Sequence, residues 1–227
     1  MKITKLVAKK VLTHDVFELV YESELDMSNI VSGQFITFLL PEIGGRAYSI
    51  ANIADDKVIL LVKRVSEENS GRGGSIMLCD AEIGTEFKSV GPVGKFVLQD
   101  TTQSKCFLGT GTGLAPLYHQ VLRSVERGCE LKMIFGVRKY EDVFYEQELL
   151  ELKETYSNFD FTIYLSRETE IKADHFKSGY VTEFLNSDSV KDYGEYYLCG
   201  APVVVESCEQ KLSDLGVSQE SIFEEKY

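Results

Sequence analysis

Hydrophobic residues in the first part of the chain occur in short runs that turn residues interrupt. The runs are rich in β-branched and aromatic residues and cover 16–21, 34–40, 47–50, 57–65 and 96–98. Short strands without long intervening helices are typical of an antiparallel barrel or sandwich. We therefore expect residues 1–98 to form an antiparallel β-barrel or β-sandwich domain, with a tight turn at 91–94 near its end.

From about Lys105 the pattern changes to strands that alternate with helices. Strand-like apolar runs cover 106–109, 131–137, 159–166 and 196–200. After residue 113, apolar positions recur at 114, 117, 118, 121, 122 and 125, which is helical spacing that ends at Gly128. Such alternation predicts a mostly parallel sheet covered on both faces. The second half, residues 102–227, is therefore expected to be an α/β domain.

Charge and composition exclude several classes of partner. The 227 residues carry a net charge of −12 at pH 7, with 11 basic and 13 acidic residues before residue 99 and 13 and 23 after it. This acidic balance argues against nucleic acid or an anionic membrane as the main partner. No apolar run reaches membrane-spanning length, and the first residues lack a secretory signal pattern. We expect a cytoplasmic protein without membrane insertion.

The cysteines and histidines suggest no metal. Five cysteines are scattered over the chain, an odd number without the spacing of a disulfide framework, a zinc site or an iron-sulfur cluster. The histidines at 14, 119 and 175 also lie too far apart for a metal motif. We expect reduced thiols, and histidines that are solvated or structural.

The segment Arg46-Ala47-Tyr48-Ser49 combines side chains that suit a planar, phosphorylated ring. In a strand, Arg46 and Tyr48 point to one face and Ser49 to the other. A guanidinium group matches two phosphate oxygens at once, and a tyrosine can lie flat on a conjugated ring. The alternative is an ordinary strand that leaves the preceding Gly-Gly turn.

A glycine-rich turn from Gly71 to Ser75 leads into a short apolar segment with helical spacing. Glycines let backbone N–H groups approach a ligand closely, and a helix amino terminus favours phosphate. Ser75 is placed either to cap this helix or to contact a phosphate oxygen. The alternative is a flexible loop followed by an N-capped helix.

A second glycine-rich run, Gly-Thr-Gly-Thr-Gly-Leu-Ala-Pro, spans residues 109–116 and joins a strand to a helix. This arrangement lays a pyrophosphate on the helix amino terminus. It departs from the usual Gly-x-Gly-x-x-Gly pattern, because Pro116 stands where a third glycine is expected. Proline suits the first turn of a helix, where its missing N–H costs nothing.

Two arginines follow predicted strands, Arg138 after one and Arg167, preceded by Ser166, after the next. The carboxyl ends of parallel strands form the ligand-binding edge of an α/β sheet. These three side chains suit the 2′-phosphate of NADPH, whereas an NAD site more often places a carboxylate on the ribose. We expect NADPH, with NADH as the alternative nucleotide; either arginine alone is also consistent with a surface cation.

The motifs together resemble those of the ferredoxin-NADP(+) reductase superfamily, in its stand-alone two-domain form. The Arg-x-Tyr-Ser segment, the Gly-Gly-Ser turn, the Gly-Thr-Gly-Thr-Gly loop, a Ser-Arg-Glu, a Cys-Gly and an aromatic carboxyl end occur in that superfamily's order over nearly the whole chain. The resemblance implies that the barrel binds FAD rather than FMN and that the α/β domain binds NAD(P)H.

The resemblance also implies a role for each matched residue. Arg46 would hold a flavin phosphate, Tyr48 would stack on the isoalloxazine and Ser49 would hydrogen-bond near flavin N5. The other expected FAD contacts are Ala47, Lys63, Gly73, Gly74, Ser75 and Tyr227. The expected NADP contacts are Thr110, Gly111, Thr112, Gly113, Pro116, Arg138, Ser166, Arg167, Cys199 and Gly200.

The same resemblance places four residues at the reacting centre, namely Ser49, Cys199, Glu225 and Tyr227. Cys199 would lie near nicotinamide C4 and shape the hydride path without acting as a nucleophile, although a lone free cysteine is usually a buried, inert thiol. Tyr227 would stack on the flavin face where nicotinamide enters, with Glu225 two residues before it. A chain end is otherwise expected to fray.

The implied activity is hydride transfer between NADPH and FAD, followed by single-electron transfer to a separate carrier such as ferredoxin or flavodoxin. Such carriers are usually acidic, so a protein of charge −12 would repel them at long range. A local patch of lysines at 2, 5, 9 and 10 could still dock them.

Other functions remain open from the sequence. Within the enzyme class, the chain could serve as the reductase component of an oxygenase or reduce free flavin. From a different class, it could be an electron-transfer subunit of a larger complex, like that of dihydroorotate dehydrogenase. That family carries a carboxyl-terminal iron-sulfur cysteine cluster, and only Cys208 follows Cys199 here. A flavin-binding sensor would not need the nucleotide loop.

Overall fold

The protein divides into two compact units, Met1–Leu98 and Gln99–Tyr227. The computed structural model describes residues 1–66, 68 and 71–227. Each unit has its own hydrophobic core. Residues 99–101, which lie between the two predicted domains, belong to the second unit.

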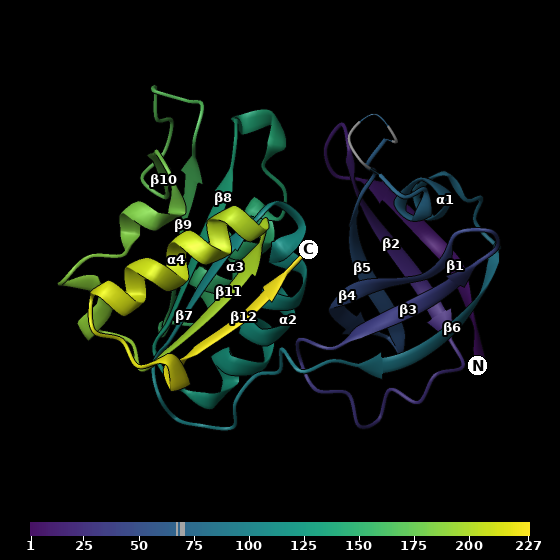
Figure 1. Cartoon of the computed structure of the whole chain (residues 1–227), viewed down its shortest axis with the longest axis horizontal. Helices are drawn as coiled ribbons and strands as arrows, with labels where there is room; N and C mark the ends of the chain where they lie inside the picture. Colours follow the sequence, from purple (N-terminus) through teal and green to yellow (C-terminus); the bar gives the residue numbers. More distant parts are fainter. Residues whose placement is uncertain (67, 69–70) are drawn as a thin grey trace. The chain divides into compact units, whose positions relative to one another are not determined.

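Unit 1 is a closed antiparallel barrel in the strand order β1-β2-β5-β4-β3-β6 (Figure 1). Its strands are β1 (Lys2–Val11), β2 (Val16–Ser23), β3 (Phe35–Leu40), β4 (Gly44–Ala54), β5 (Lys57–Lys63) and β6 (Glu86–Val93). Because side chains alternate along a strand, β3 buries Ile36, Phe38 and Leu40 inside the barrel. This packing leaves the other face of each strand for the surface.

Helix α1 (Gly74–Asp80) follows β5 and packs on the barrel core through Leu78 and Cys79. The Lys9 ammonium on β1 donates to the carbonyls of Cys79 and Ala81 at 2.8 and 2.9 Å. A lysine that binds the last carbonyls of a helix caps its carboxyl terminus. Lys9 therefore fixes α1 to the barrel.

Unit 2 is a parallel sheet in the strand order β10-β9-β8-β7-β11-β12. Its strands are β7 (Lys105–Thr110), β8 (Leu131–Val137), β9 (Phe159–Leu165), β10 (Phe176–Ser178), β11 (Glu195–Gly200) and β12 (Ile222–Lys226). All neighbouring strands in this order run parallel. The carboxyl ends of these strands therefore all lie at the same edge of the sheet.

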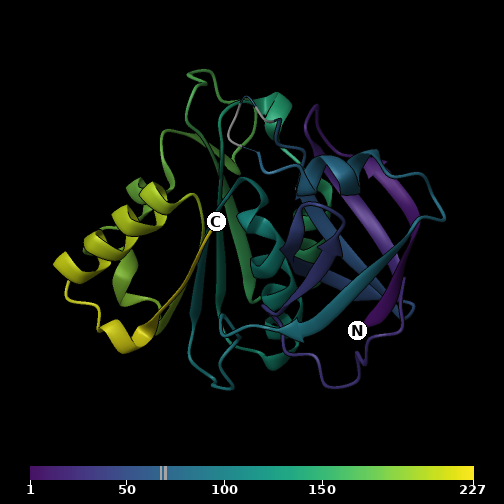
Figure 2. The same cartoon turned by 45° about the vertical axis from the view of Figure 1, so that its right-hand side comes forward.

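Helices cover both faces of this sheet, with α2 (Leu114–Ser124) on one side and α4 (Pro202–Asp214) on the other (Figure 2). Helix α3 (Glu146–Thr155) packs on β9. Every residue of β11 is buried, which matches its nearly continuous apolar sequence. Right-handed crossovers between parallel strands produce this arrangement.

The predicted fold class is confirmed for both units, but several elements differ. The prediction missed β1, β6, β10 and β12, and the predicted strand at 96–98 is wrong. Phe96 and Leu98 are buried, but their backbone is irregular. Their apolar pattern therefore reflects burial and not a strand. The predicted turn at 91–94 is also wrong for residues 91–93, which lie within β6.

Candidate functional site

Arg46, Tyr48 and Gly74 lie together on unit 1. Arg46 and Tyr48 both reach Gly74 from strand β4, which agrees with their expected position on one face. A Cβ atom added at Gly74 would lie 2.7 Å from Cγ of Arg46 and 3.0 Å from Oη of Tyr48. Since real Cβ atoms do not approach so closely, glycine is the residue that fits. The glycine turn, the arginine and the tyrosine thus form one cradle.

The Arg46 guanidinium has unused hydrogen-bonding capacity. Its Nη1 donates to the Gly45 carbonyl at 2.7 Å, and its buried Nε has no hydrogen-bond partner among the described residues. A buried donor without a partner costs about 1–3 kcal/mol. An anion such as a phosphate would satisfy this donor and match its charge.

The Tyr48 ring packs against Phe38, and its hydroxyl stays protonated. Its half-buried ring makes a T-shaped contact with Phe38, with ring centroids 5.9 Å apart. Burial raises the pKa of Tyr48 to about 12, and the charges of Arg46 and Arg72 oppose this rise. Arg72 therefore places a second positive charge near the same hydroxyl. The prediction overlooked Arg72, although its position between glycines of the turn was a usable signal.

The remaining predicted FAD residues take varied positions. Gly73 is the N-cap of α1 with a left-handed backbone, φ 79°. The Ser75 hydroxyl accepts a hydrogen bond from the Val65 N–H at 3.0 Å, so the expected cap by Ser75 is wrong. The Lys63 ammonium lies 2.9 Å from the Asp15 carboxylate, which compensates its charge.

Ser49 and Ala47 lie on β4 beside strand β3. Ser49 is half-buried and pairs in register with Phe35, and the exposed Ala47 pairs with Thr37. Both follow the alternation that the strand imposes. The two residues are therefore placed on the same strand as the cradle without joining its contacts to Gly74.

The second glycine loop lies between β7 and α2 in unit 2. Gly111–Gly113 form a short 3-10 turn, and Pro116 lies in the first turn of α2. A Cβ atom at Gly113 would overlap the Cys199 carbonyl and lie 2.9 Å from Oη of Tyr227. Gly111 has φ 53° and open space around its Cα. The loop thus packs closely on β11 at Gly113 and is open at Gly111.

Thr110 fills the space between two glycines at the same edge. A Cβ atom at Gly200 would overlap the Thr110 hydroxyl, and one at Gly136 would lie 3.1 Å from its methyl group. Both glycines lie near the ends of strands that flank β7 in the sheet. The glycines at 136 and 200 therefore allow residues 110–113 to pack against the carboxyl edge of the sheet.

Cys199, Glu225 and Tyr227 meet where β11 and β12 end. Cys199 is opposite Glu225 in the parallel register, and the Tyr227 N–H donates to the Gly200 carbonyl at 3.3 Å. Cys199 is 1% exposed, and burial, reinforced by the charges of Glu225 and Glu224, raises the pKa of its thiol well above the ordinary value. A protonated, buried thiol is a poor nucleophile.

The carboxyl end of the chain is ordered, because β12 leads directly to Tyr227. The alternative of a loose, fraying tail is therefore wrong for residues 222–226. Tyr227 as a whole residue is 56% exposed, but its hydroxyl lies close to Gly113, and burial raises the pKa of this hydroxyl well above the ordinary value. The terminal ring thus bridges from β12 to the glycine loop.

Arg138, Ser166 and Arg167 lie side by side at the carboxyl edge. The Ser166 N–H donates to the Val137 carbonyl at 3.1 Å, and the Arg167 N–H donates to the Arg138 carbonyl at 2.8 Å. Both arginine side chains are exposed. The sheet topology therefore assembles the predicted basic cluster from two separate loops.

Tyr180 adds an aromatic ring to this edge, which the prediction overlooked. It follows Gly179, whose N–H donates to the Leu165 carbonyl at 3.1 Å, and its side chain is 63% exposed. An exposed aromatic ring next to a basic cluster can stack on a base. Recognition of the short strand β10 would have placed Tyr180 here.

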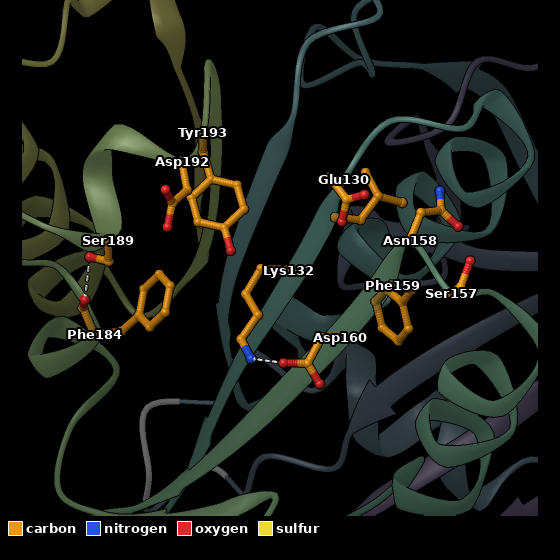
Figure 3. Close-up of a pocket in the computed structure, with 11 residues that line it drawn as sticks. Glu130, Lys132, Ser157, Asn158, Phe159, Asp160, Phe184, Ser189, Asp192 and Tyr193 are labelled. Atoms are coloured by element: carbon orange, nitrogen blue, oxygen red, sulfur yellow. Dashed lines mark hydrogen bonds and ion pairs between the residues drawn. The ribbon is translucent and has the colours of Figure 1, made fainter.

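A separate pocket of about 230 Å³ lies at the amino ends of β8 and β9 (Figure 3). None of the predicted site residues lines it. Lys132 and Asp160 point toward one another and form an ion pair, and the Lys153 ammonium is 2.6 Å from the same carboxylate. These charges compensate one another within the pocket.

Comparisons with known proteins agree with this geometry. Residues 107–210 match the family described as the oxidoreductase NAD-binding domain. A component of the Na(+)-translocating NADH-quinone reductase of Marinomonas sp. (strain MWYL1) is 29% identical over 192 residues, which cover 78% of this chain and 47% of the relative. The chain thus spans about half the length of the curated relatives it matches.

Two solved structures extend the likeness to both units. The Amycolatopsis cytochrome P450 reductase GcoB aligns with a TM-score of 0.87 and 26% identity, over 99% of this chain and 69% of that one. A ferredoxin NADP+ reductase from Neisseria gonorrhoeae with bound FAD and NADP aligns with a TM-score of 0.80 over 99% and 97% of the two chains. Its 19% identity shows a shared fold.

An antiparallel barrel followed by a parallel α/β unit with a glycine loop is the fold of flavoprotein reductases. In both units the chain is similar to ferredoxin reductase-like proteins, and its residues 107–210 match the oxidoreductase NAD-binding domain, as in the ferredoxin-NADP(+) reductase superfamily. Across residues 1–66, 68 and 71–227, none of the helices is long and apolar enough to cross a bilayer.

Proposed function

We propose that the chain is an FAD-dependent reductase that takes a hydride from NADPH and passes electrons singly to a separate acceptor. The observation that carries this proposal is the meeting of Cys199, Glu225 and Gly113 at the carboxyl edge of unit 2. A small protonated thiol, a carboxylate and a glycine loop are suited to position a nicotinamide ring without reacting with it.

FAD fits the cradle of unit 1. The unpartnered Nε of Arg46 and the nearby charge of Arg72 suit the flavin phosphates, and the glycine at 74 lets Arg46 and Tyr48 pack closely against the turn. Tyr48 would lie against the ring system, and Ser49 would hydrogen-bond near N5. When bound, FAD accepts a hydride and releases its electrons one at a time.

The nucleotide would extend along the carboxyl edge of unit 2. The open turn around Gly111 suits the pyrophosphate, and the arginines at 138 and 167 suit a 2′-phosphate together with Ser166. Tyr180 would stack on the adenine. This basic cluster supports NADPH rather than NADH as the hydride donor.

Tyr227 would act as a gate for the nicotinamide. Its hydroxyl lies close to Gly113 and its backbone N–H binds the residue after Cys199, which is where the nicotinamide would enter. Burial raises the pKa of its hydroxyl well above the ordinary value, so the ring would have to leave this contact with the glycine loop when the nicotinamide binds. Glu225 would then hydrogen-bond the carboxamide and hold the ring over Cys199.

The acceptor is proposed to be a ferredoxin or flavodoxin, although the lysine patch on β1 supports this weakly. Lys9 is bound to the end of α1, and Lys5 and Lys10 stand opposite Glu22 and Glu18 in the barrel register. These neighbours offset much of the positive charge that an acidic carrier would need.

A second candidate is therefore a reductase that serves an oxygenase or a larger electron-transfer complex. The similarity to a cytochrome P450 reductase and to a component of an NADH-quinone reductase supports this candidate. The two candidates share the cradle and the glycine loop and differ in the acceptor and in the preferred nucleotide.

The test starts from the purified protein, whose visible spectrum is expected to show bound flavin. Anaerobic stopped-flow measurements would compare flavin reduction by NADPH and by NADH, and steady-state assays would compare ferredoxin, flavodoxin and free flavin as acceptors. Ser49→Ala should slow the reduction while FAD stays bound. A colourless protein that does not take up added FAD would refute the proposed function.

A further inference from the structure

We propose that Tyr197 is a positioning residue that holds two parts of unit 2 in place. One part is the segment 99–104, through which the chain enters unit 2, and the other is strand β12, which carries Glu225 and leads to Tyr227. The consequence for catalysis rests on the proposed function, whereas the anchoring of the segment does not.

The change from one unit to the other takes place over a single peptide link. The Leu98 N–H donates to the Ser32 carbonyl at 3.0 Å within unit 1. The next N–H, that of Gln99, donates to the Tyr197 hydroxyl at 3.0 Å within unit 2. Consecutive residues are thus each held by their own unit.

A buried polar network keeps the Tyr197 hydroxyl in place. The hydroxyl donates to Glu195 at 2.7 Å, and the Lys105 ammonium lies 3.2 Å from the same carboxylate. The Lys105 side chain is fully buried and that of Glu195 is 6% exposed. Buried charges are tolerated when each is paired and hydrogen-bonded, and such networks are rigid.

The same network reaches the rest of the entering segment. The Lys105 ammonium donates to the Thr101 hydroxyl at 2.8 Å and to the Gln103 carbonyl at 3.0 Å. The Thr101 hydroxyl in turn donates to Glu195. Residues 99–104 are therefore tied to the amino ends of β7 and β11 at several points, and they do not form a free linker.

The Tyr197 ring makes the second connection, to β12. It stacks between Phe107 on β7 and Phe223 on β12, with centroid distances of 5.1 and 4.9 Å. The three residues are directly opposite one another in the parallel register. Two residues further along, the same register places Cys199 opposite Glu225. The stack thus fixes the register that brings these two residues together.

The test removes only the hydroxyl, by Tyr197→Phe in the FAD-loaded protein. Hydrogen exchange at residues 99–104 should become about tenfold faster, because the Gln99 N–H loses its acceptor. The rate of flavin reduction by NADPH should fall about threefold with an unchanged KM, since nucleotide binding is intact and only the approach of the reactants is disturbed.

The matched control is Tyr196→Phe. Tyr196 is the neighbouring buried tyrosine on β11, and its hydroxyl donates to the Val190 carbonyl at 2.9 Å, on the face of the sheet opposite to Tyr197. This variant should leave both the exchange at 99–104 and the reduction rate unchanged. Equal effects of the two variants would mean that the loss of any buried hydroxyl on β11 has the same result and that the bond to Gln99 has no special role, which overturns the proposal.

A second variant, Phe223→Leu, removes the stack and keeps the hydroxyl. Exchange should then increase at residues 222–227 and stay normal at 99–104. The proposal is overturned if Tyr197→Phe leaves exchange at 99–104 within about twofold of the original protein. Exchange needs no turnover, so failure of the anchoring and failure of the proposed function give different results.

Discussion

The two candidate binding regions are built in different ways. In unit 1, one strand supplies both Arg46 and Tyr48, and a single glycine at 74 completes the cradle. In unit 2, the site residues come from separate segments that the parallel sheet brings to one edge. The first region depends on side-chain chemistry, and the second depends on close backbone packing.

This difference teaches where each region should be sensitive to substitution. Removing a charge should weaken the cradle of unit 1, because its contacts are made by a guanidinium and a hydroxyl. Adding a methyl group should damage the edge of unit 2, because its strands approach one another through glycines. Opposite kinds of substitution therefore test the two regions.

The largest effect is expected for Gly113→Ala. Its Cβ would overlap the Cys199 carbonyl and press on the Tyr227 hydroxyl, which moves β11 away from the loop. We expect kcat/KM for NADPH to fall about 100-fold, as displacements of about 1 Å do at reacting centres. The visible FAD spectrum should stay unchanged, because the cradle lies in unit 1.

Gly111→Ala is the control for this prediction. Its Cβ meets no protein atom, so it leaves the contact with Cys199 intact and costs only backbone strain at φ 53° and any crowding of the bound pyrophosphate. Equal losses for the two variants would show that the loop fails through strain rather than through contact with Cys199, and the contrast between the two regions would then be wrong.

The next effect in size is expected for Arg46→Gln. Loss of a charge-assisted hydrogen bond to phosphate should weaken FAD binding about 30-fold, measured by flavin fluorescence on reconstitution of the apoprotein. Arg64→Gln is the control, because Arg64 is paired with Asp80 at 2.7 Å elsewhere on unit 1. If Arg46→Gln bound FAD with unchanged affinity, the cradle would not be the phosphate-binding site.

The sequence predicted the local parts of both regions and missed the long-range ones. Arg46 to Ser49 are consecutive, so their shared chemistry is visible in the sequence. The closeness of Gly74 to this segment depends on how α1 folds onto the barrel. Strand β12 was missed because its Glu-Glu-Lys sequence resembles a solvated tail, whereas the pairing with β11 fixes it.

The polar network around Tyr197 could not be predicted for a similar reason. The hydrogen bond between Gln99 and Tyr197 joins residues 98 positions apart. Nothing in the local pattern of a buried strand distinguishes Tyr197 from its neighbour Tyr196. Their partners differ only because alternate residues of β11 face opposite sides of the sheet.

A smaller effect is expected when both arginines at the edge of unit 2 are replaced. Arg138→Ser combined with Arg167→Ser should raise KM for NADPH about tenfold and change KM for NADH little, because only NADPH carries the 2′-phosphate. Lys139→Ser is the control, since Lys139 lies 3.3 Å from Glu141 and is already compensated. Equal increases in KM for NADPH and NADH would show that the arginines attract anions in general and do not recognise the 2′-phosphate.

The smallest expected effect is a pH dependence of stability that should appear in unit 2 and not in unit 1. His119 on α2 is buried, and neither ring nitrogen has a hydrogen-bond partner in the part of the chain that the structure describes. Burial, reinforced by the charge of Arg123, lowers the pKa of His119 from 6.5 to about 4. The folded unit therefore favours the neutral ring, whereas the unfolded chain takes up a proton below about pH 6.5.

The stability that His119 contributes is thus complete above pH 6.5 and is lost as the pH falls toward 4. Between about pH 7 and 5.5, unit 2 should lose about 1 kcal/mol more than it does in His119→Leu, which has no ring to protonate. Hydrogen exchange measured separately for each unit would show this difference in unit 2 and none in unit 1. Parallel pH profiles for the two proteins in unit 2 would show that His119 does not titrate with unfolding.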